Sequence, residues 1–307
     1  KVAYQTAYMK ANYPVEYMTA ILTADSGDVE KIGEIIGECK NMKIPVLPPN
    51  INESYGNFTV ILPDTKNELV TPELTFKEGK IRFGLYTIKN LGGDIADAII
   101  AERKTHGKFL SVSDFLRRVQ HKNLNKKSME ALIKSGSMDE WGDRGVLLTN
   151  LEDMLLWNKE VSNQNHNQTS LFGDDHAGNI AKFKLKNAPE ATTEEKLIWE
   201  KELLGLYISG HPLDKIKDKL EKKDINIKKI LKEKDGGAQI TIAGIIDSAR
   251  IIITKNNERM AFLKISDFTG SIEAVVFPNI FKESGDILLA EKCIALTGKV
   301  SLRNGEK

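Results

Sequence analysis

The residue spacing with the clearest chemistry is Lys89-Asn90-Leu91-Gly92-Gly93, in which a lysine stands beside a glycine turn. Glycines allow a turn to bring its backbone N–H groups close to an anion, and the first turn of a following helix adds N–H groups without intrahelical partners. Asn90 occupies the first glycine position of the usual Gly-hydrophobic-Gly turn, and asparagine tolerates a positive φ better than most residues. We therefore predict a phosphate-binding turn, with Leu91 tucked inside it and Lys89 supplying charge.

The flanking residues predict the elements that position this turn. Residues 83–89 and 94–103 read as short helices on either side of it, an arrangement called a helix-hairpin-helix. A second candidate hairpin is Lys122-Asn123-Leu124-Asn125, followed by a helix that starts with Lys126 and Lys127. Lysines at a helix N-terminus oppose the helix dipole, which makes sense opposite an anion. The alternative to the first hairpin is an ordinary Gly-Gly turn without a ligand. The alternative to the second is a plain surface helix.

Charge is distributed unevenly along the chain, although 44 basic and 43 acidic residues give a net charge of only +1. Residues 80–136 carry 12 basic and 5 acidic residues, a net +7 that contains both candidate hairpins. The net charge is −4 over residues 1–79, −6 over residues 137–200 and +4 over residues 201–307. A basic block is often only a solvated face, but the hairpins inside it favour a nucleic-acid partner.

A polar segment over residues 162–191 is rich in Asn, Gln, Asp, His and Gly and predicts a flexible linker. It contains Gln168-Thr169-Ser170-Leu171-Phe172. Two adjacent apolar side chains are unusual in such a segment unless something binds them. Leu171 and Phe172 would fill an apolar pocket of a partner while the Gln168 amide makes hydrogen bonds, as in other linear peptides. Alternatively, the two residues pin the linker to the protein's own surface.

Alternating apolar residues at the C-terminal end predict strands over 240–253, 259–266, 271–277 and 292–302, with a helix over 279–290. Three strands, a helix and further strands describe the OB-fold, a five-stranded barrel that often binds single-stranded nucleic acid. The fifth strand is missing, since the sequence stops in the turn before it. We therefore expect a truncated barrel, from a fragment of a larger protein.

The charged and aromatic residues of this predicted barrel indicate a single-strand-binding surface, because such surfaces combine cations with stacking rings. The candidate residues are Arg250, Lys255, Arg259, Phe262 and Lys264. Phe262 could instead belong to the barrel core, and for Phe277 we expect the core position.

Composition adds few candidates for catalysis or metal binding. The length of 307 residues suggests two or three domains, and no apolar run could cross a bilayer. Cys39 and Cys293 form no disulfide framework or metal cluster, and the five histidines are scattered. The carboxylate pairs Asp139-Glu140 and Asp174-Asp175 lie at a helix end and in the linker. We predict no catalytic residue, no metal site and no cofactor in this chain.

Several further stretches occur in a fixed order along the chain. They are Tyr4-Gln5-Thr6-Ala7-Tyr8-Met9-Lys10-Ala11, Val46-Leu47-Pro48-Pro49-Asn50-Ile51-Asn52, Ile81-Arg82-Phe83-Gly84-Leu85, Trp199-Glu200-Lys201-Glu202-Leu203-Leu204-Gly205 and Ser209-Gly210-His211-Pro212-Leu213-Asp214. Together with the hairpins, the linker pentapeptide and the barrel, they resemble the bacterial replicative DNA polymerase III alpha-subunit family. The resemblance covers nearly the whole chain.

This resemblance implies a multidomain α + β protein in which a helical end of the fingers and a helix-hairpin-helix region precede a truncated OB-fold barrel. The implied domains are 1–79 (end of the fingers), 80–161 (tandem helix-hairpin-helix, duplex binding), 162–191 (flexible linker with the clamp-binding peptide), 192–236 (helical connector) and 237–307 (OB-fold).

The resemblance also implies a function for the segment. It would hold primer-template DNA and single-stranded template during replication in the cytoplasm, tethered through Gln168, Leu171 and Phe172 to the beta sliding clamp. Other replisome subunits, such as the clamp loader, are implied partners, and no membrane is. The full-length protein would be a DNA-directed DNA polymerase whose palm, expected before residue 1, holds Mg²⁺. This segment alone would be inactive. A free-standing nucleic-acid-binding adaptor and a mutagenic paralogue of the alpha subunit are the alternatives.

Overall fold

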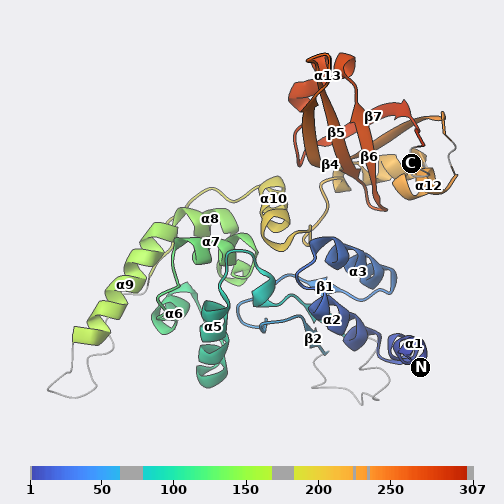
Figure 1. Cartoon of the computed structure of the whole chain (residues 1–307). Coiled ribbons are helices and arrows are strands. Elements are labelled where there is room, and N and C mark those ends of the chain that lie inside the picture. Colours follow the sequence, from blue (N-terminus) through green and yellow to red (C-terminus); the bar gives the residue numbers. More distant parts are fainter. Residues whose placement is uncertain (1, 63–78, 168–182, 224–225, 234–235, 303–307) are drawn as a thin grey trace. The chain divides into compact units, whose positions relative to one another are not determined.

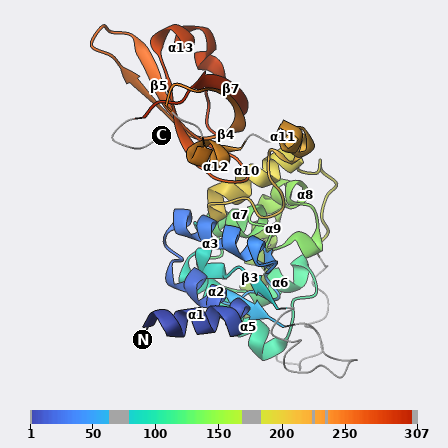
Figure 2. The same cartoon turned by 90° about the vertical axis from the view of Figure 1, so that its right-hand side faces the viewer.

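The computed structural model of the protein describes residues 2–62, 79–167, 183–223, 226–233 and 236–302 (Figures 1 and 2). The pentapeptide Gln168–Phe172 lies outside the described residues. The chain forms two compact units, which we call unit 1 (Lys1–Ser209) and unit 2 (Gly210–Lys307). Unit 1 is mainly helical and unit 2 contains an antiparallel barrel-like sheet, so the predicted multidomain α + β class is confirmed.

Unit 1 begins with three helices and a small sheet. The helices are α1 (Val2–Asn12), α2 (Pro14–Ala24) and α3 (Val29–Asn41), and the strands are β1 (Val46–Leu47), β2 (Thr59–Ile61) and β3 (Lys80–Arg82). Pro14 lies in the first turn of α2, where the missing N–H costs no intrahelical bond. The strand order is β1-β3-β2, with β1 parallel and β2 antiparallel to β3. The sheet leads the chain directly into the first hairpin.

The remainder of unit 1 consists of short helices around one apolar core. They are η1 (Leu85–Thr87), α5 (Gly93–His106), α6 (Val112–Arg118), α7 (Lys126–Lys134), η2 (Asp139–Trp141), α8 (Arg144–Thr149), α9 (Leu151–Asn167) and α10 (Thr193–Leu204). Phe83, Ile99, Phe115 and Leu132 are all fully buried in this core. Burial of these side chains therefore fixes the helices that carry both hairpins.

The predicted helix over residues 83–89 is wrong, because only the 3-10 turn η1 forms there. Gly84 is extended, with φ −84° and ψ 154°. A Cβ at Gly84 would lie 2.3 Å from the carbonyl oxygen of Gly56. The backbone therefore passes too close to a distant segment for a helix to start before Leu85.

The predicted linker is wrong at both of its ends. Residues 162–167 continue helix α9. Further along, Ser113 Oγ donates a hydrogen bond of 3.0 Å to the carbonyl oxygen of Phe183, whose ring contacts Trp157. The Asn150 side chain bonds the backbone of Lys186 in both directions. The chain after residue 182 is therefore part of the packed surface of unit 1.

Within the described residues, unit 2 contains a curled antiparallel sheet of four strands, which is consistent with the predicted OB-fold. The strands are β4 (Gln239–Ile253), β5 (Arg259–Ser266), β6 (Ser271–Val276) and β7 (Cys293–Lys299), in the order β6-β5-β4-β7. Ile246, Leu263, Ile265 and Val276 fill the interior. The predicted helix over 279–290 is shorter and forms α13 (Pro278–Ser284) and η5 (Gly285–Ile287).

Unit 2 also includes the short helices before the sheet, η4 (Asp214–Ile216), α11 (Lys217–Lys223) and α12 (Ile227–Glu233). The Ile227 and Lys228 N–H groups donate to Asp267 Oδ2 and Thr269 Oγ1, at 2.7 and 3.2 Å, in the β5–β6 turn. Ile230 is buried in the barrel core. In Figures 1 and 2, α12 and α13 lie at opposite ends of the sheet. The division between the units thus falls within the predicted connector, after Ser209.

Within the described part of the chain, no helix is both long enough and apolar enough to cross a membrane.

Candidate nucleic-acid interface

The first hairpin has the backbone geometry that anion binding needs. Asn90 has a φ of +69°, so it takes the conformation that the usual glycine would supply. Leu91 is only 7% exposed and closes the turn on the core. Gly92, in an extended conformation, is the N-cap of α5. Gly92 and Gly93 are exposed, and among the described residues neither N–H group has an acceptor. Two amides are therefore available to an anion.

The second hairpin has the same residue pattern as the first, but its N-cap residue is an asparagine instead of a glycine. The predicted helix start at Lys126 is confirmed, because Asn125 is the N-cap of α7 and forms a capping box with Ser128. Leu124 is 7% exposed, like its counterpart Leu91. Both turns begin with Lys-Asn-Leu, and in both the fourth residue of the run is the N-cap of the following helix. Sequence inspection could have found this repeat by aligning Lys89 with Lys122.

A side-chain hydrogen bond joins the two turns. Asn123 Nδ2 of the second turn donates to Asp94 Oδ2 in the first turn of α5. Because Asn123 precedes the N-cap Asn125 and Asp94 follows the N-cap Gly92, the two helix N-termini lie next to each other. The structure thus brings both sets of predicted duplex-binding residues together.

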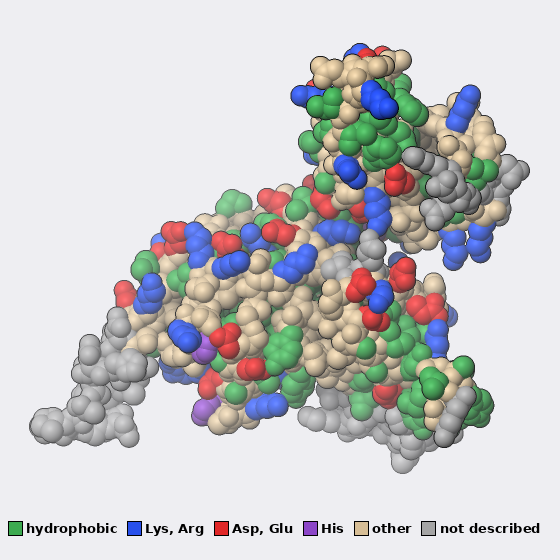
Figure 3. All heavy atoms as spheres, in the orientation of Figure 1, with side chains coloured by type: hydrophobic (Ala, Val, Ile, Leu, Met, Phe, Trp, Pro, Cys, Tyr) green, Lys and Arg blue, Asp and Glu red, His purple; other side chains and the backbone are tan. Residues whose placement is uncertain are grey.

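The two hairpins differ in local charge. Exposed Lys89 at the first turn is accompanied by exposed Asp94 and Asp97. The second turn carries three exposed lysines, which are Lys122, Lys126 and Lys127. Figure 3 shows basic and acidic side chains interspersed over α8 and α10. Three of the twelve basic residues of the +7 block therefore lie at the second hairpin, and one lies at the first.

One lysine of the second hairpin is already paired. Lys126 Nζ lies 3.0 Å from Glu152 Oε1 on α9, and both side chains are exposed. The hydrogen bond to Glu152 raises the pKa of Lys126 above its ordinary value, so the amine is fully charged. Exposed ion pairs are weak, and a phosphate can therefore take the place of Glu152.

A buried ion pair joins α8 to α10, and we call these two helices the frame of the hairpins. Arg144 Nη1 on α8 donates to Glu200 Oε1 on α10 at 3.0 Å, and the two side chains are 3% and 0% exposed. Glu200 Oε2 also accepts the N–H groups of Ile208 and Ser209, each at 2.9 Å. Burial lowers the pKa of Arg144, but Asp139 and Glu200 outweigh it and raise the pKa above the ordinary value. Sequence reasoning missed this pair, since 56 residues separate its members.

The same frame reaches the first hairpin through the backbone. The Lys89 N–H donates to the carbonyl oxygen of Leu203 at 3.0 Å, near the C-terminal end of α10. Arg103, 8% exposed on α5, donates to the carbonyl oxygens of Ile51 and Ser54 at 2.7 and 2.8 Å. Hydrogen bonds therefore fix both the turn at Lys89 and the C-terminal part of α5 to the rest of unit 1.

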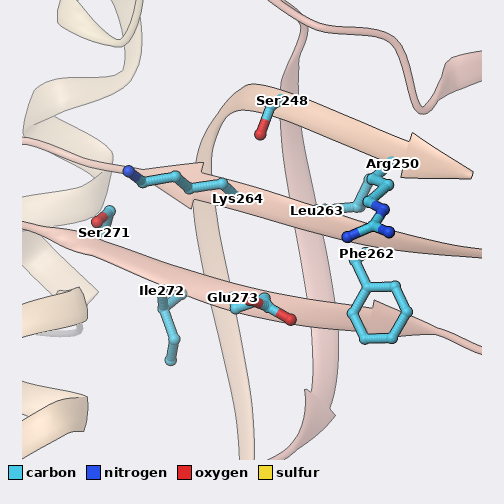
Figure 4. Close-up of a pocket in the computed structure, with 8 residues that line it drawn as sticks. All are labelled: Ser248, Arg250, Phe262, Leu263, Lys264, Ser271, Ile272 and Glu273. Atoms are coloured by element: carbon cyan, nitrogen blue, oxygen red, sulfur yellow. The ribbon is translucent and has the colours of Figure 1, made fainter.

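The sheet of unit 2 carries a surface pocket of about 560 Å³. Its lining residues are Ser248, Arg250, Phe262, Leu263, Lys264, Ser271, Ile272 and Glu273. In Figure 4 the Arg250 guanidinium lies beside the Phe262 ring at one end, and the Lys264 amine lies near Ser271 at the other. The strand register pairs Arg250 with Phe262 and Lys264 with Glu273. The pocket thus combines two cations, one aromatic ring and one acid.

The other two predicted single-strand-binding residues lie elsewhere. Lys255 is exposed in the turn between β4 and β5. Arg259 is exposed at the start of β5, on the face of the strand opposite to Phe262, because side chains alternate along a strand. The structure therefore brings three of the five candidates together.

Phe277 is 64% exposed, so the expectation that it belongs to the barrel core is wrong. Val276 takes the inward position beside it, with 7% exposure. A shift of one residue in a strand moves a side chain to the opposite face, which explains the error.

Among the residues that the structure describes, no three His, Cys, Asp or Glu side chains come together as a metal site.

Two family models match the parts of the chain that carry the hairpins and the pocket of unit 2. A family model described as a helix-hairpin-helix motif matches residues 43–147. A model of the OB-fold nucleic acid binding domain matches residues 240–307. The first match covers the two hairpins and ends before α10, and the second covers the sheet that carries the pocket.

Homologous proteins cover nearly the whole chain. The DNA polymerase III subunit alpha of Borreliella burgdorferi is 37% identical over 306 residues, which are 98% of this chain and 25% of that protein. The proteins of the same name from Thermus aquaticus and Mycobacterium tuberculosis are each 33% identical, over 92% and 99% of this chain and 22% and 25% of their own lengths. The chain therefore spans about a quarter of the length of these relatives.

Proposed function

We propose that this chain, which is homologous along nearly its whole length to about a quarter of the DNA polymerase III alpha subunit, is the DNA-holding part of such a replicative polymerase. It holds primer-template duplex and single-stranded template rather than joining nucleotides itself. Nucleotide addition, with its Mg²⁺ ions, belongs in this proposal to a part of the polymerase that the chain does not cover.

Duplex binding is assigned to the paired hairpins. The first hairpin offers the Gly92 and Gly93 amides to a phosphate, and the second offers Lys122, Lys126 and Lys127. Such contacts position a duplex without reading its bases. The hydrogen bond between the two turns carries this proposal, because it holds both anion-binding ends at a fixed spacing.

Single-strand binding is assigned to the pocket on the sheet of unit 2. The Phe262 ring would stack on a base while Arg250 and Lys264 contact the backbone phosphates. The match of residues 240–307 to an OB-fold nucleic acid binding domain supports this assignment. Lys255 and Arg259, outside the pocket, remain candidates for contacts along a longer strand.

Clamp binding is assigned to Gln168, Leu171 and Phe172, on the sequence pattern alone. A second attachment raises the effective concentration of the polymerase at its substrate, which increases processivity. The clamp loader, or another replisome subunit, is a further proposed partner.

A crossed pair of variants tests the two DNA surfaces in the full chain. Phe262→Ala should weaken binding to a single-stranded oligonucleotide and leave blunt duplex unaffected. Neutralising Lys122, Lys126 and Lys127 to Gln should do the reverse, with fluorescence anisotropy as the measurement. Equal effects of both variants on both DNAs would contradict the division of labour.

A matched control separates local contacts from overall charge. Replacing Lys10, Lys31 and Lys40 of unit 1 with Gln also removes three positive charges, but at positions outside the hairpins. If this control weakens duplex binding as much as the hairpin variant does, the binding reflects net charge and the hairpin assignment fails.

A further inference from the structure

Phe277 is a large aromatic side chain on the surface of unit 2 that the function proposed above leaves unused. It directly follows β6, is 64% exposed and forms the N-cap of α13. Its backbone is extended, with φ −70° and ψ 159°, so the alternation of the strand continues through it. The chain therefore holds this ring outward rather than folding it into the core.

Extending the strand register by one residue beyond β6 places Phe277 on the same face as the pocket. Val276 pairs with Ala261, and both are buried. Val275 pairs with Phe262 and is 43% exposed, so Val275 and Phe277 both belong to the outward set. Phe277 is thus the diagonal neighbour of Phe262 across β5 and β6, and such neighbours are about 7–8 Å apart.

We infer that Phe277 is a second base-stacking position, and that unit 2 binds two unpaired bases of one nucleic-acid strand. This inference rests on the proposed single-strand binding by the Phe262 pocket. The general spacing of diagonal neighbours, about 7–8 Å, exceeds the roughly 3.4 Å step between stacked bases. Phe262 and Phe277 therefore stack on two different bases, and exposed Val275 provides apolar surface between the two rings.

The surroundings favour a nucleic-acid strand over an apolar protein segment as the occupant. Arg250 lies next to Phe262 in the register, and Lys264 lies two residues further along the same face. An aromatic row flanked by cations suits bases joined by phosphates. Glu273, opposite Lys264, makes the far end of the pocket less favourable for phosphate. The strand is therefore expected to run from Arg250 past Phe262 to Phe277.

Substitutions in the full chain test the stacking position, with binding of a fluorescent oligothymidylate as the measurement. Phe277→Ala should weaken binding about 5- to 150-fold, the range for loss of one stacked base. Phe277→Trp should restore it, because any aromatic ring can stack. Phe277→Leu keeps an apolar side chain but no ring, and should bind as weakly as the alanine variant.

Ile280→Ala is the matched control, since Ile280 is also an exposed apolar residue, on the neighbouring helix α13. It should leave the affinity unchanged. Equal weakening by Ile280→Ala, or full affinity of Phe277→Leu, would overturn base stacking at Phe277. Thermal denaturation of each variant verifies that unit 2 is folded.

Phe262→Ala separates the failure of this inference from failure of the proposed function. If Phe262→Ala weakens binding and Phe277→Ala does not, the second stacking position is wrong while single-strand binding stands. If the unaltered chain binds no single strand, both are wrong.

Discussion

Neutralising the lysines of the second hairpin should change the salt dependence of duplex binding more than neutralising Lys89. The structure places three exposed lysines at the second turn, whereas the first turn has Lys89 alone and is followed in the chain by exposed Asp94 and Asp97. Each phosphate neutralised by a lysine contributes about 0.9 to the slope of log affinity against log salt concentration. Replacing Lys122, Lys126 and Lys127 with Gln should therefore lower the slope by about 2.7.

The expected magnitude is large enough to measure. Between 50 and 200 mM salt, each lost contact removes roughly a 3.5-fold change in affinity, and three contacts together remove roughly a 40-fold change. Lys89→Gln should lower the slope by less than the value of about 0.9 that one full phosphate contact contributes. Glu152→Gln should act in the opposite direction, because it releases Lys126 from its ion pair.

Anisotropy titrations with duplexes of two unrelated sequences, at four salt concentrations, measure these slopes. The effect should be the same for both sequences, because phosphate contacts carry no base information. An unchanged slope in the triple variant would refute the phosphate role of the second hairpin. A slope in Lys89→Gln that falls as far as in the triple variant would refute the distinction between the hairpins.

Three further outcomes follow from the frame, the linker and the surface of unit 1. Glu200→Ala removes one of the two carboxylates that pair with buried Arg144, together with the acceptor of the Ile208 and Ser209 N–H groups, and should lower the free energy of unfolding by about 3–5 kcal/mol in a denaturant titration; a loss below about 1 kcal/mol would contradict this. Replacing Leu171 and Phe172 with Ala should abolish clamp binding in a pull-down and leave DNA affinity intact, whereas equal loss of both would contradict the peptide's role. Burial raises the pKa of Asp114, but hydrogen bonds from a backbone N–H and two arginines outweigh it and hold the pKa below its ordinary value. Its stabilising contribution is therefore complete above the ordinary pKa of about 3.9 and is lost as the pH falls through the lower folded value. Asp114→Asn should make unfolding less dependent on pH below about 4, and an unchanged acid transition would contradict this.

Local sequence patterns predicted the strands of unit 2 and the start of the second hairpin helix well. The span of β5 is the predicted one, Arg259–Ser266, because its apolar residues alternate toward a single buried face. The start of α7 at Lys126 was predictable for a similar reason. Asn125 is a strong N-cap residue, and the apolar residues that follow have helical spacing. In both places the information lies within a few residues of the element.

Features that depend on distant segments were not predictable from local patterns. Gly84 stops a helix because its backbone approaches Gly56, which is 28 residues away in the sequence. Arg144 pairs with Glu200 across 56 residues. In the site, no local pattern could place Asp94 beside Asn123, and this contact is what makes the two hairpins one surface.

The chemistry of the hairpins bears on how a polymerase could hold a duplex and still move along it. Backbone amides such as those of Gly92 and Gly93 bind phosphates without adding a full charge, so they release few counterions. Only the lysines add steep salt dependence, and one of them, Lys126, must exchange Glu152 for phosphate. The grip should therefore consist of many weak contacts that re-form at each phosphate step. An acid at each hairpin lowers the affinity that lysines alone would give, and a second attachment through a clamp would then supply the persistence that this shallow grip lacks.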